Sequence, residues 1–138
     1  MQGPSGDSQH RVQRDGDLLI FVADGPILEA HVDATIVAAE AIIQEHARYD
    51  LLIDVQKLTR VDPSARRRAA TASVNQYLGN IAIFGASLVI RALLTLVIRG
   101  MMMMGRSHVM VHFCNTEDEA RAWLDAQRAQ RLSSPAKP

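Results

Sequence analysis

The sequence predicts an α/β fold in which a mostly parallel β-sheet is covered by helices. Two observations predict it. Apolar runs of strand length alternate with segments of helical periodicity along most of the chain, and the turns between them are short and rich in Asp, Gly, Pro and Ser. Strands that alternate with helices are typical of parallel βαβ units. The 138 residues suffice for one hydrophobic core, so we expect a single domain with the element order ββαβαβαβα.

The beginning of the chain predicts a hairpin followed by a helix. Residues 11–14 and 17–23 flank Asp15-Gly16, a strong hairpin signal, so two antiparallel strands are expected to open the domain. The turn-forming run Asp24-Gly25-Pro26 is expected to end the second strand. Apolar residues then recur at three- and four-residue steps, which predicts an amphipathic helix ending near His46. The apolar positions of this helix are Leu28, Val32, Ile36, Ala39 and Ile43.

The middle of the chain predicts a strand, a helix and another strand. Residues 49–55 are almost continuously apolar, as in a strand buried on both faces. Asp62 suits the N-cap of a helix and Pro63 its first position, so a helix is expected from there to about Tyr77. Residues 81–84 are expected to form the next buried strand.

The last third of the chain predicts two further helices separated by a strand. Ser87 can cap a helix over residues 87–104, and residues 109–113 have the composition of a strand. Thr116 and Glu119 have the spacing of a capping box, which predicts that the final helix begins there.

Four motifs within residues 17–124 resemble a known family by their order and spacing. They are the acidic strand end at Asp54, the helix start Asp62-Pro63-Ser64, the turn at residues 83–87, and Glu119-Ala120 followed by Trp123-Leu124. Together they resemble the SpoIIAA-like family, small bacterial STAS-type domains grouped with the lipid-binding CRAL-TRIO folds. The resemblance implies a β/α superhelix without enzymatic activity. It also implies action through a protein partner, as in the anti-sigma-factor antagonists of this family.

Composition excludes several classes of function. Lys+Arg and Asp+Glu both number 15, so the chain lacks the basic excess of a nucleic-acid-binding domain. The single cysteine, Cys114, excludes an intrachain disulfide and fits a reducing compartment. The N-terminus also lacks the pattern of a signal peptide, so a cytoplasmic location is expected. Residues 1–9 and 132–138 are expected to be disordered, which leaves residues 10–131 as the domain.

Residues 81–98 approach the length of a membrane span. Arg91 lies near the centre of this segment, where a charge is costly in a bilayer, and Gly85 divides it into a strand-length and a helix-length part. We therefore expect contact with a membrane surface at most, and no transmembrane helix.

Ser64 is the candidate for regulation by phosphorylation. The resemblance places it, behind Asp62, where anti-sigma-factor antagonists carry their phosphorylated serine. A phosphate there would meet the N-terminus of a helix. Two features depart from the family pattern, since Pro63 replaces the first serine of the motif and the glycine that normally follows is absent. The alternative is a polar first-turn residue with a structural role only.

Two other groups of residues invite a ligand and have simpler explanations. Arg66, Arg67 and Arg68 are candidates for an anion or phospholipid-headgroup patch, but consecutive helical residues fan around the axis, as on a solvated face. His108, His112 and Cys114 share one face of a strand. Side chains two and four residues apart are separated by about 6.6 Å and about 13 Å, too far for one ion. No metal or other cofactor is expected.

The helix over residues 87–104 is the candidate working surface. Its polar residues form a narrow stripe, and the rest is more apolar than a helix covering a sheet requires. We expect this surplus to be buried by a protein partner, such as a second copy in a homodimer. The alternative is a carrier or sensor of an apolar ligand, such as a fatty acid or lipid, in a pocket under the helix. No serine is marked as a nucleophile, which disfavours an enzyme. The candidate surface residues are Leu93, Val97, Met101, Met102, Met103 and Met104.

Overall fold

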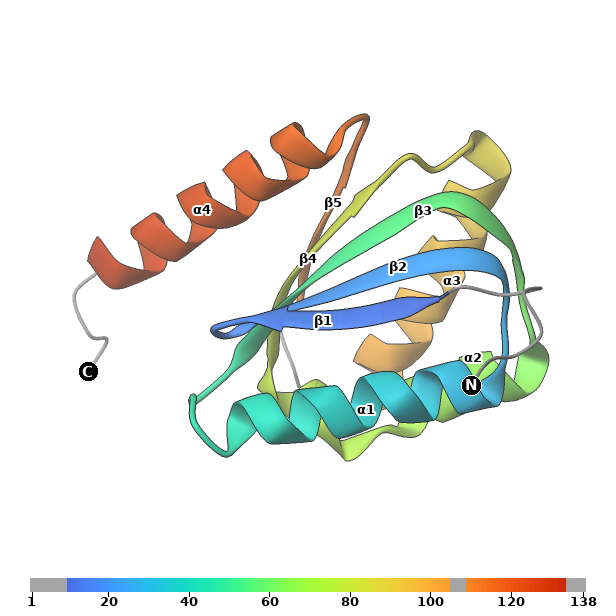
Figure 1. Cartoon of the computed structure of the whole chain (residues 1–138), viewed down its shortest axis with the longest axis horizontal. Coiled ribbons are helices and arrows are strands. Elements are labelled where there is room, and N and C mark those ends of the chain that lie inside the picture. Colours follow the sequence, from blue (N-terminus) through green and yellow to red (C-terminus); the bar gives the residue numbers. More distant parts are fainter. Residues whose placement is uncertain (1–9, 105–108, 134–138) are drawn as a thin grey trace.

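A computed structural model describes residues 10–104 and 109–133. It contains a five-stranded sheet in the order β1-β2-β3-β4-β5 (Figure 1). β1 runs antiparallel to β2, and the other neighbouring pairs are parallel. This mixed, mostly parallel sheet and its ββαβαβαβα element order confirm the predicted fold class. The strands are β1 (Arg11–Asp15), β2 (Leu18–Ile27), β3 (Tyr49–Val61), β4 (Leu78–Phe84) and β5 (Met110–Cys114).

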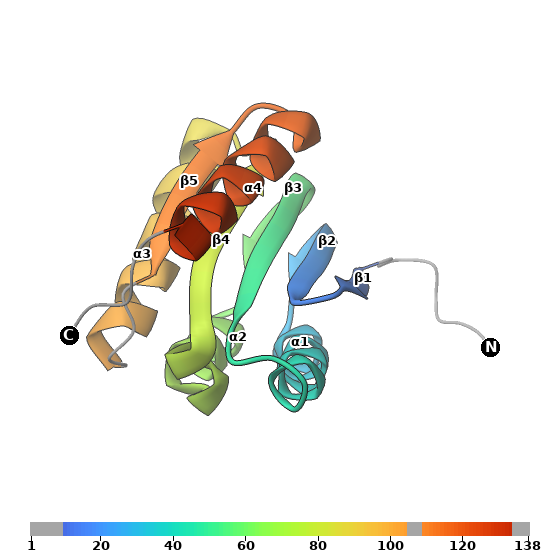
Figure 2. The same ribbon diagram turned by 90° about the vertical axis from the view of Figure 1, so that its left-hand side faces the viewer.

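The helices cover both faces of the sheet. α4 (Glu117–Ser133) lies on one face, while α1 (Glu29–Ile43), α2 (Pro63–Thr71) and α3 (Leu88–Met104) lie on the other (Figures 1 and 2). A short 3₁₀ helix, η1 (Ser73–Tyr77), connects α2 to β4. The expected capping box is present at the start of α4, where the Glu119 N–H donates to Thr116 Oγ1 at 3.2 Å.

The central strands are apolar because both of their faces are covered. Leu52 of β3 and Phe84 of β4 belong to the core beneath α4. Ile81 and Ile83 of β4 belong to the larger core beneath α1, α2 and α3. Since successive side chains of a strand point to opposite faces, a parallel strand buried on both sides has no polar alternation.

Two strands are longer than the sequence analysis predicts. β2 does not end at Asp24-Gly25-Pro26 but continues to Ile27, and β3 continues past Val55 to Val61. The two extensions pair with each other in parallel, up to Ile27 opposite Val61. The pairing register shifts on either side of Asp24-Gly25, so the strand continues through these turn-forming residues with local irregularities. Pairing with β3 therefore overrides the local turn preference.

Two helix ends were also predicted too late. α1 ends at Ile43 rather than near His46, and α2 ends at Thr71 rather than near Tyr77. Ala72 has extended backbone angles, and the following turn is the 3₁₀ helix η1. Asp62 occupies the N-cap of α2, as expected, although its carboxylate pairs with Arg60 instead of capping a backbone N–H.

Candidate functional site

The outward face of α3 is an exposed apolar surface. Four large side chains, separated by helical spacings, leave most of their area in solvent. They are Leu88, Val89, Leu96 and Met103, with exposed fractions of 85, 76, 63 and 86 %. Single exposed apolar residues are ordinary on soluble proteins, but a contiguous group marks a surface that contacts something. We call these four residues the α3 face.

Arg91 and Thr95, two members of the polar stripe of α3, do not lie on this outward face. Arg91 lies over the ring of Phe113 in β5, 5.3 Å from its centroid, which is a cation–π geometry. Thr95 Oγ1 donates to the Arg91 carbonyl oxygen at 2.7 Å. Arg91 thus lies on the flank beside β5. The solvent-facing side is consequently left to apolar residues, with Arg99 as the exposed charge among them.

The structure distributes the predicted surface residues over three environments. Met103 and, to a lesser degree, Met102 are exposed, whereas Met101 is buried in the core. Leu93 and Val97 are half-buried and pack against that core. The side chain of Met104 lies outside the described residues. Leu88, Val89 and Leu96 were not among the predicted surface residues, although the helical phase identifies them once the direction of the sheet is known.

An apolar cavity lies beneath α3, between the sheet, α1 and α2, and has a volume of about 140 Å³. Its helical walls include alanines, among them Ala39, Ala65 and Ala69. Larger side chains at these positions would reach into the space. The cavity lies under the helix, where the alternative function, a carrier of an apolar ligand, would require a pocket.

A second depression lies outside the cavity, in the groove between α2 and α3, with a volume of about 380 Å³. Its apolar lining includes Ala70, Leu96 and Gly100, and its basic lining is Arg66 and Arg67. We call it the α2–α3 groove. Val97 lines both the groove and the cavity, so the two spaces adjoin at this side chain.

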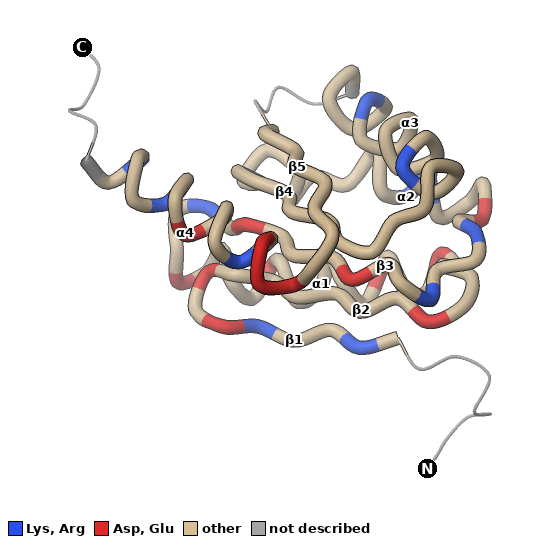
Figure 3. The backbone as a smooth tube through the Cα atoms, turned by 90° about the horizontal axis from the view of Figure 1, so that it is seen from above, with Lys and Arg blue, Asp and Glu red and all other residues tan. Residues whose placement is uncertain are grey.

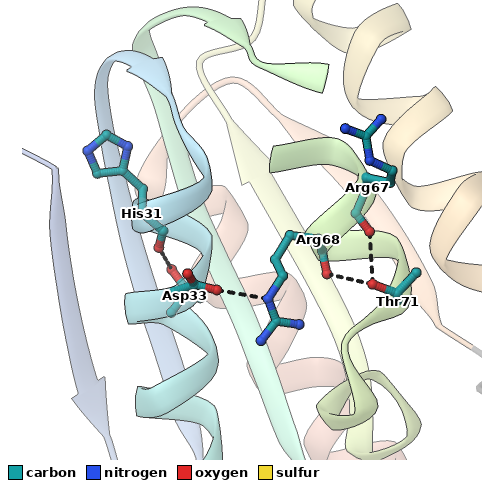
Figure 4. Close-up of polar contacts among 6 residues, drawn as sticks. His31, Asp33, Arg67, Arg68 and Thr71 are labelled. Atoms are coloured by element: carbon teal, nitrogen blue, oxygen red, sulfur yellow. Dashed lines mark hydrogen bonds and ion pairs between the residues drawn. The ribbon is translucent and has the colours of Figure 1, made fainter. Parts of the chain in front are cut away.

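The three consecutive arginines of α2 do not form one patch. Arg68 turns toward α1 and donates to Asp33 at 2.8 Å, whereas Arg67 points toward α3 (Figure 4). Arg66 and Arg67 line the α2–α3 groove, so two of the three candidate anion-binding residues share one site. Neither α2 nor α3 contains an acidic residue, and Figure 3 shows basic positions on both helices.

Ser64 occupies the second position of α2, directly behind Pro63 and Asp62. Its side chain is half-buried, and Arg66 lies two residues further along the same helix. This is the first turn of a helix, as predicted, where backbone N–H groups lack intrahelical acceptors. Phosphorylation of Ser64 stays a prediction.

Two of the residues considered for a metal site, His112 and Cys114, lie in the described part of the chain. His112 stacks on Trp123 of α4, with ring centroids 5.0 Å apart, and His108 lies outside the described residues. Burial, with a contribution from Glu119, raises the pKa of the Cys114 thiol. No group of three potential metal-ligating side chains occurs among residues 10–104 and 109–133.

Comparison with known families assigns the chain to a defined domain. The sequence model of that domain, described as a domain of unknown function, DUF7793, matches residues 12–128. The chain belongs to the DUF7793 family. No curated protein sequence matches the chain. In the described part of this DUF7793 domain, no helix combines the length and the apolar character needed to cross a membrane.

Solved structures of similar fold confirm the resemblance to SpoIIAA-like proteins. An uncharacterised DUF3478-family protein with a SpoIIAA-like fold from Shewanella loihica PV-4 aligns with a TM-score of 0.60 and 17 % identity, over 90 % of this chain and 98 % of that one. The anti-sigma factor antagonist SpoIIAA in its unphosphorylated form aligns with a TM-score of 0.54 and 12 % identity, over 85 % of this chain and 98 % of that one. The phosphorylated Bacillus cell fate determinant SpoIIAA aligns with a TM-score of 0.51 and 13 % identity, over 84 % of this chain and 99 % of that one. At these identities the likeness shows a shared fold alone.

Proposed function

We propose that this DUF7793 domain is a non-enzymatic regulatory module that acts through protein–protein contacts made by the α3 face. The observation that carries the proposal is the exposure of four large apolar side chains on one helix. Covering such a surface removes apolar area from water, which drives association. A solved protein of the same fold is an anti-sigma factor antagonist, which supports a role in binding proteins. The proposed location is the cytoplasm.

A second copy of the chain is the proposed partner, because the α3 face has a nearly two-fold pattern. Leu96 lies at its centre, with Val89 seven residues before it and Met103 seven residues after it. A two-fold axis at Leu96 would pair α3 antiparallel with its copy and bring Val89 of one protomer to Met103 of the other. The two Arg99 residues would then lie roughly 9 Å apart along the helix axis, which avoids direct contact of like charges.

The proposal is tested by the mass of the protein in solution. Size-exclusion chromatography with light scattering should show a dimer for the wild type and a monomer for Leu96→Glu. Val37→Glu is the matched control, since Val37 is 64 % exposed, like Leu96, but belongs to α1. This control should remain dimeric. A monomeric wild type, or a dimeric Leu96→Glu variant, would overturn the proposal.

Leu96 is a sharper test position than Val97. Val97 lines the internal cavity as well as the groove, so a carboxylate there would be placed against the apolar core. Loss of the dimer in a Val97→Glu variant could then reflect unfolding. Leu96 is 63 % exposed, so a glutamate at this position remains solvated.

A further inference from the structure

We infer that the α2–α3 groove and the adjoining cavity form a binding site for a single-chain anionic amphiphile, that is, an acyl chain with a carboxylate or phosphate head. This function goes beyond the protein contacts proposed for the α3 face. The head would lie in the groove at Arg66 and Arg67. The chain would pass Val97, which borders both spaces, and enter the cavity.

The apolar part of the site is shaped by small residues. Ala65 and Ala69 of α2 border the cavity, and Ala70 of the same helix borders the groove. Gly100 of α3 faces α2 so closely that an added Cβ would lie 3.8 Å from the Cβ of Ala70. Protein interiors are normally close-packed, so an apolar space of about 140 Å³ is suited to hold an apolar group.

The charged part of the site favours an anion. Among the described residues, neither Arg66 nor Arg67 forms an ion pair. The nearest acidic residue in sequence, Asp62, is paired with Arg60. Guanidinium groups bind carboxylates and phosphates through charge-assisted hydrogen bonds. Two unpaired arginines above an apolar floor thus match a ligand that is charged at one end and apolar at the other.

The dimensions and charge of the site favour an amphiphile over a single phosphate or a wholly apolar molecule. The groove, at about 380 Å³, is within the range of small-molecule sites and far exceeds a single phosphate. A wholly apolar molecule would leave the two arginines without a counter-charge. An acyl chain with an anionic head uses both the arginines and the apolar walls.

The test is calorimetric titration of the wild-type protein with dodecanoate, dodecyl phosphate and hexanoate, below their micelle concentrations. Saturable binding of both twelve-carbon ligands is expected. Affinity should rise about two- to fourfold for each methylene beyond hexanoate until the cavity is filled. The double variant Arg66→Ala/Arg67→Ala should bind dodecanoate about tenfold more weakly. Arg11→Ala/Arg121→Ala, with the same change of charge outside the site, should bind like the wild type.

A second variant addresses the cavity. Ala69→Met fills part of it and should abolish the dependence on chain length while hexanoate binding is retained. Circular dichroism checks that each variant is folded. If Ala69→Met does not fold, the comparison of the two arginine double variants still tests the inference. Absence of saturable binding to the wild type would overturn the inference. So would an equal affinity of the Arg66→Ala/Arg67→Ala variant and the wild type for dodecanoate.

Discussion

The imidazole rings of His10 and His31 lie 3.9 Å apart, centroid to centroid, where the chain enters α1. Both rings accept a backbone N–H through Nδ1. Leu28 donates to His31 at 2.9 Å, and Asp24 donates to His10 at 3.2 Å. When neutral, each ring therefore carries its proton on Nε2, and His10 Nε2 donates to the Pro26 carbonyl oxygen at 2.9 Å. Protonation of Nδ1 would remove an acceptor from a backbone N–H.

Acidification should therefore destabilise the fold at His31. Burial, and secondarily the charge of His10, lower the pKa of His31 below its ordinary value of 6.5. A group with a lowered folded pKa resists protonation in the folded state, so its contribution is present above pH 6.5 and lost as the pH falls below it. Because the ring is partly solvated, we expect a loss below about 1 kcal/mol between pH 7.5 and 5.5, measured by urea denaturation.

Two histidine variants separate this effect from general acid sensitivity. His31→Gln can still accept the Leu28 N–H through its side-chain oxygen but does not titrate, so its loss between pH 7.5 and 5.5 should be smaller. His46→Gln, at an exposed position, should lose as much as the wild type. If His31→Gln loses as much stability as the wild type between pH 7.5 and 5.5, groups other than His31 cause the pH dependence.

Asp50 should be important for stability. Its carboxylate is buried, and Oδ1 accepts the backbone N–H of Asn80 at 2.9 Å and the side-chain amide at 3.3 Å. Asp50→Ala would leave these buried donors unsatisfied and would also remove the carboxylate that lies 4.0 Å from the Arg131 guanidinium. We expect a loss of about 2–4 kcal/mol in urea denaturation. The exposed Asp125→Ala change on α4 should cost less than about 0.5 kcal/mol. Equal losses in both variants would contradict this role.

Two glycine-to-alanine substitutions should have opposite effects. Gly85 has a φ of +84°, and an added Cβ would lie 2.4 Å from Cγ of Gln56, so Gly85→Ala should cost about 1–3 kcal/mol. Gly100 lies within α3, where an added Cβ meets nothing closer than 3.8 Å. Gly100→Ala should stabilise the protein by about 0.5–1 kcal/mol because alanine favours the helix. Thermal unfolding checks both, and the same sign for both would contradict the prediction.

A negative charge at Ser64 should stabilise α2. The second position of a helix lies in the positive end of its dipole, so Ser64→Asp should raise stability by about 0.3–1 kcal/mol at low salt. Thr71→Asp puts the same charge at the last residue of α2, where it should lower stability. If Ser64→Asp and Thr71→Asp shift the thermal unfolding temperature in the same direction, the helix dipole does not cause the change in stability.

Regulation through Ser64 has its own measurement. Mass spectrometry of protein purified from its native cells should find a phosphopeptide that contains Ser64. Phosphate at this position would add charge near Arg66, at the edge of the α2–α3 groove. Complete recovery of the unmodified peptide under all growth conditions would rule out this switch.

Local signals in the sequence predicted the elements that depend on neighbouring residues. Asp15-Gly16 turns the first hairpin, and Thr116 with Glu119 begins α4, because these motifs act within a few residues of the chain. The apolar run at residues 81–84 likewise predicted a buried strand, which is part of β4. The same local preference failed at Asp24-Gly25-Pro26, where pairing with β3 continues the strand.

The sequence by itself determined the fold class and selected α3 as the helix with surplus apolar surface. Only the tertiary structure decided which side of α3 faces solvent, because Arg91 packs on Phe113 of a strand that follows it in the chain. The arrangement of α2 beside α3 likewise brings Arg66 and Arg67 to a groove that shares the lining residue Val97 with the cavity beneath α3. Helical periodicity fixes which residues share a face, but the contacts that bury one face and expose another come from segments distant in sequence.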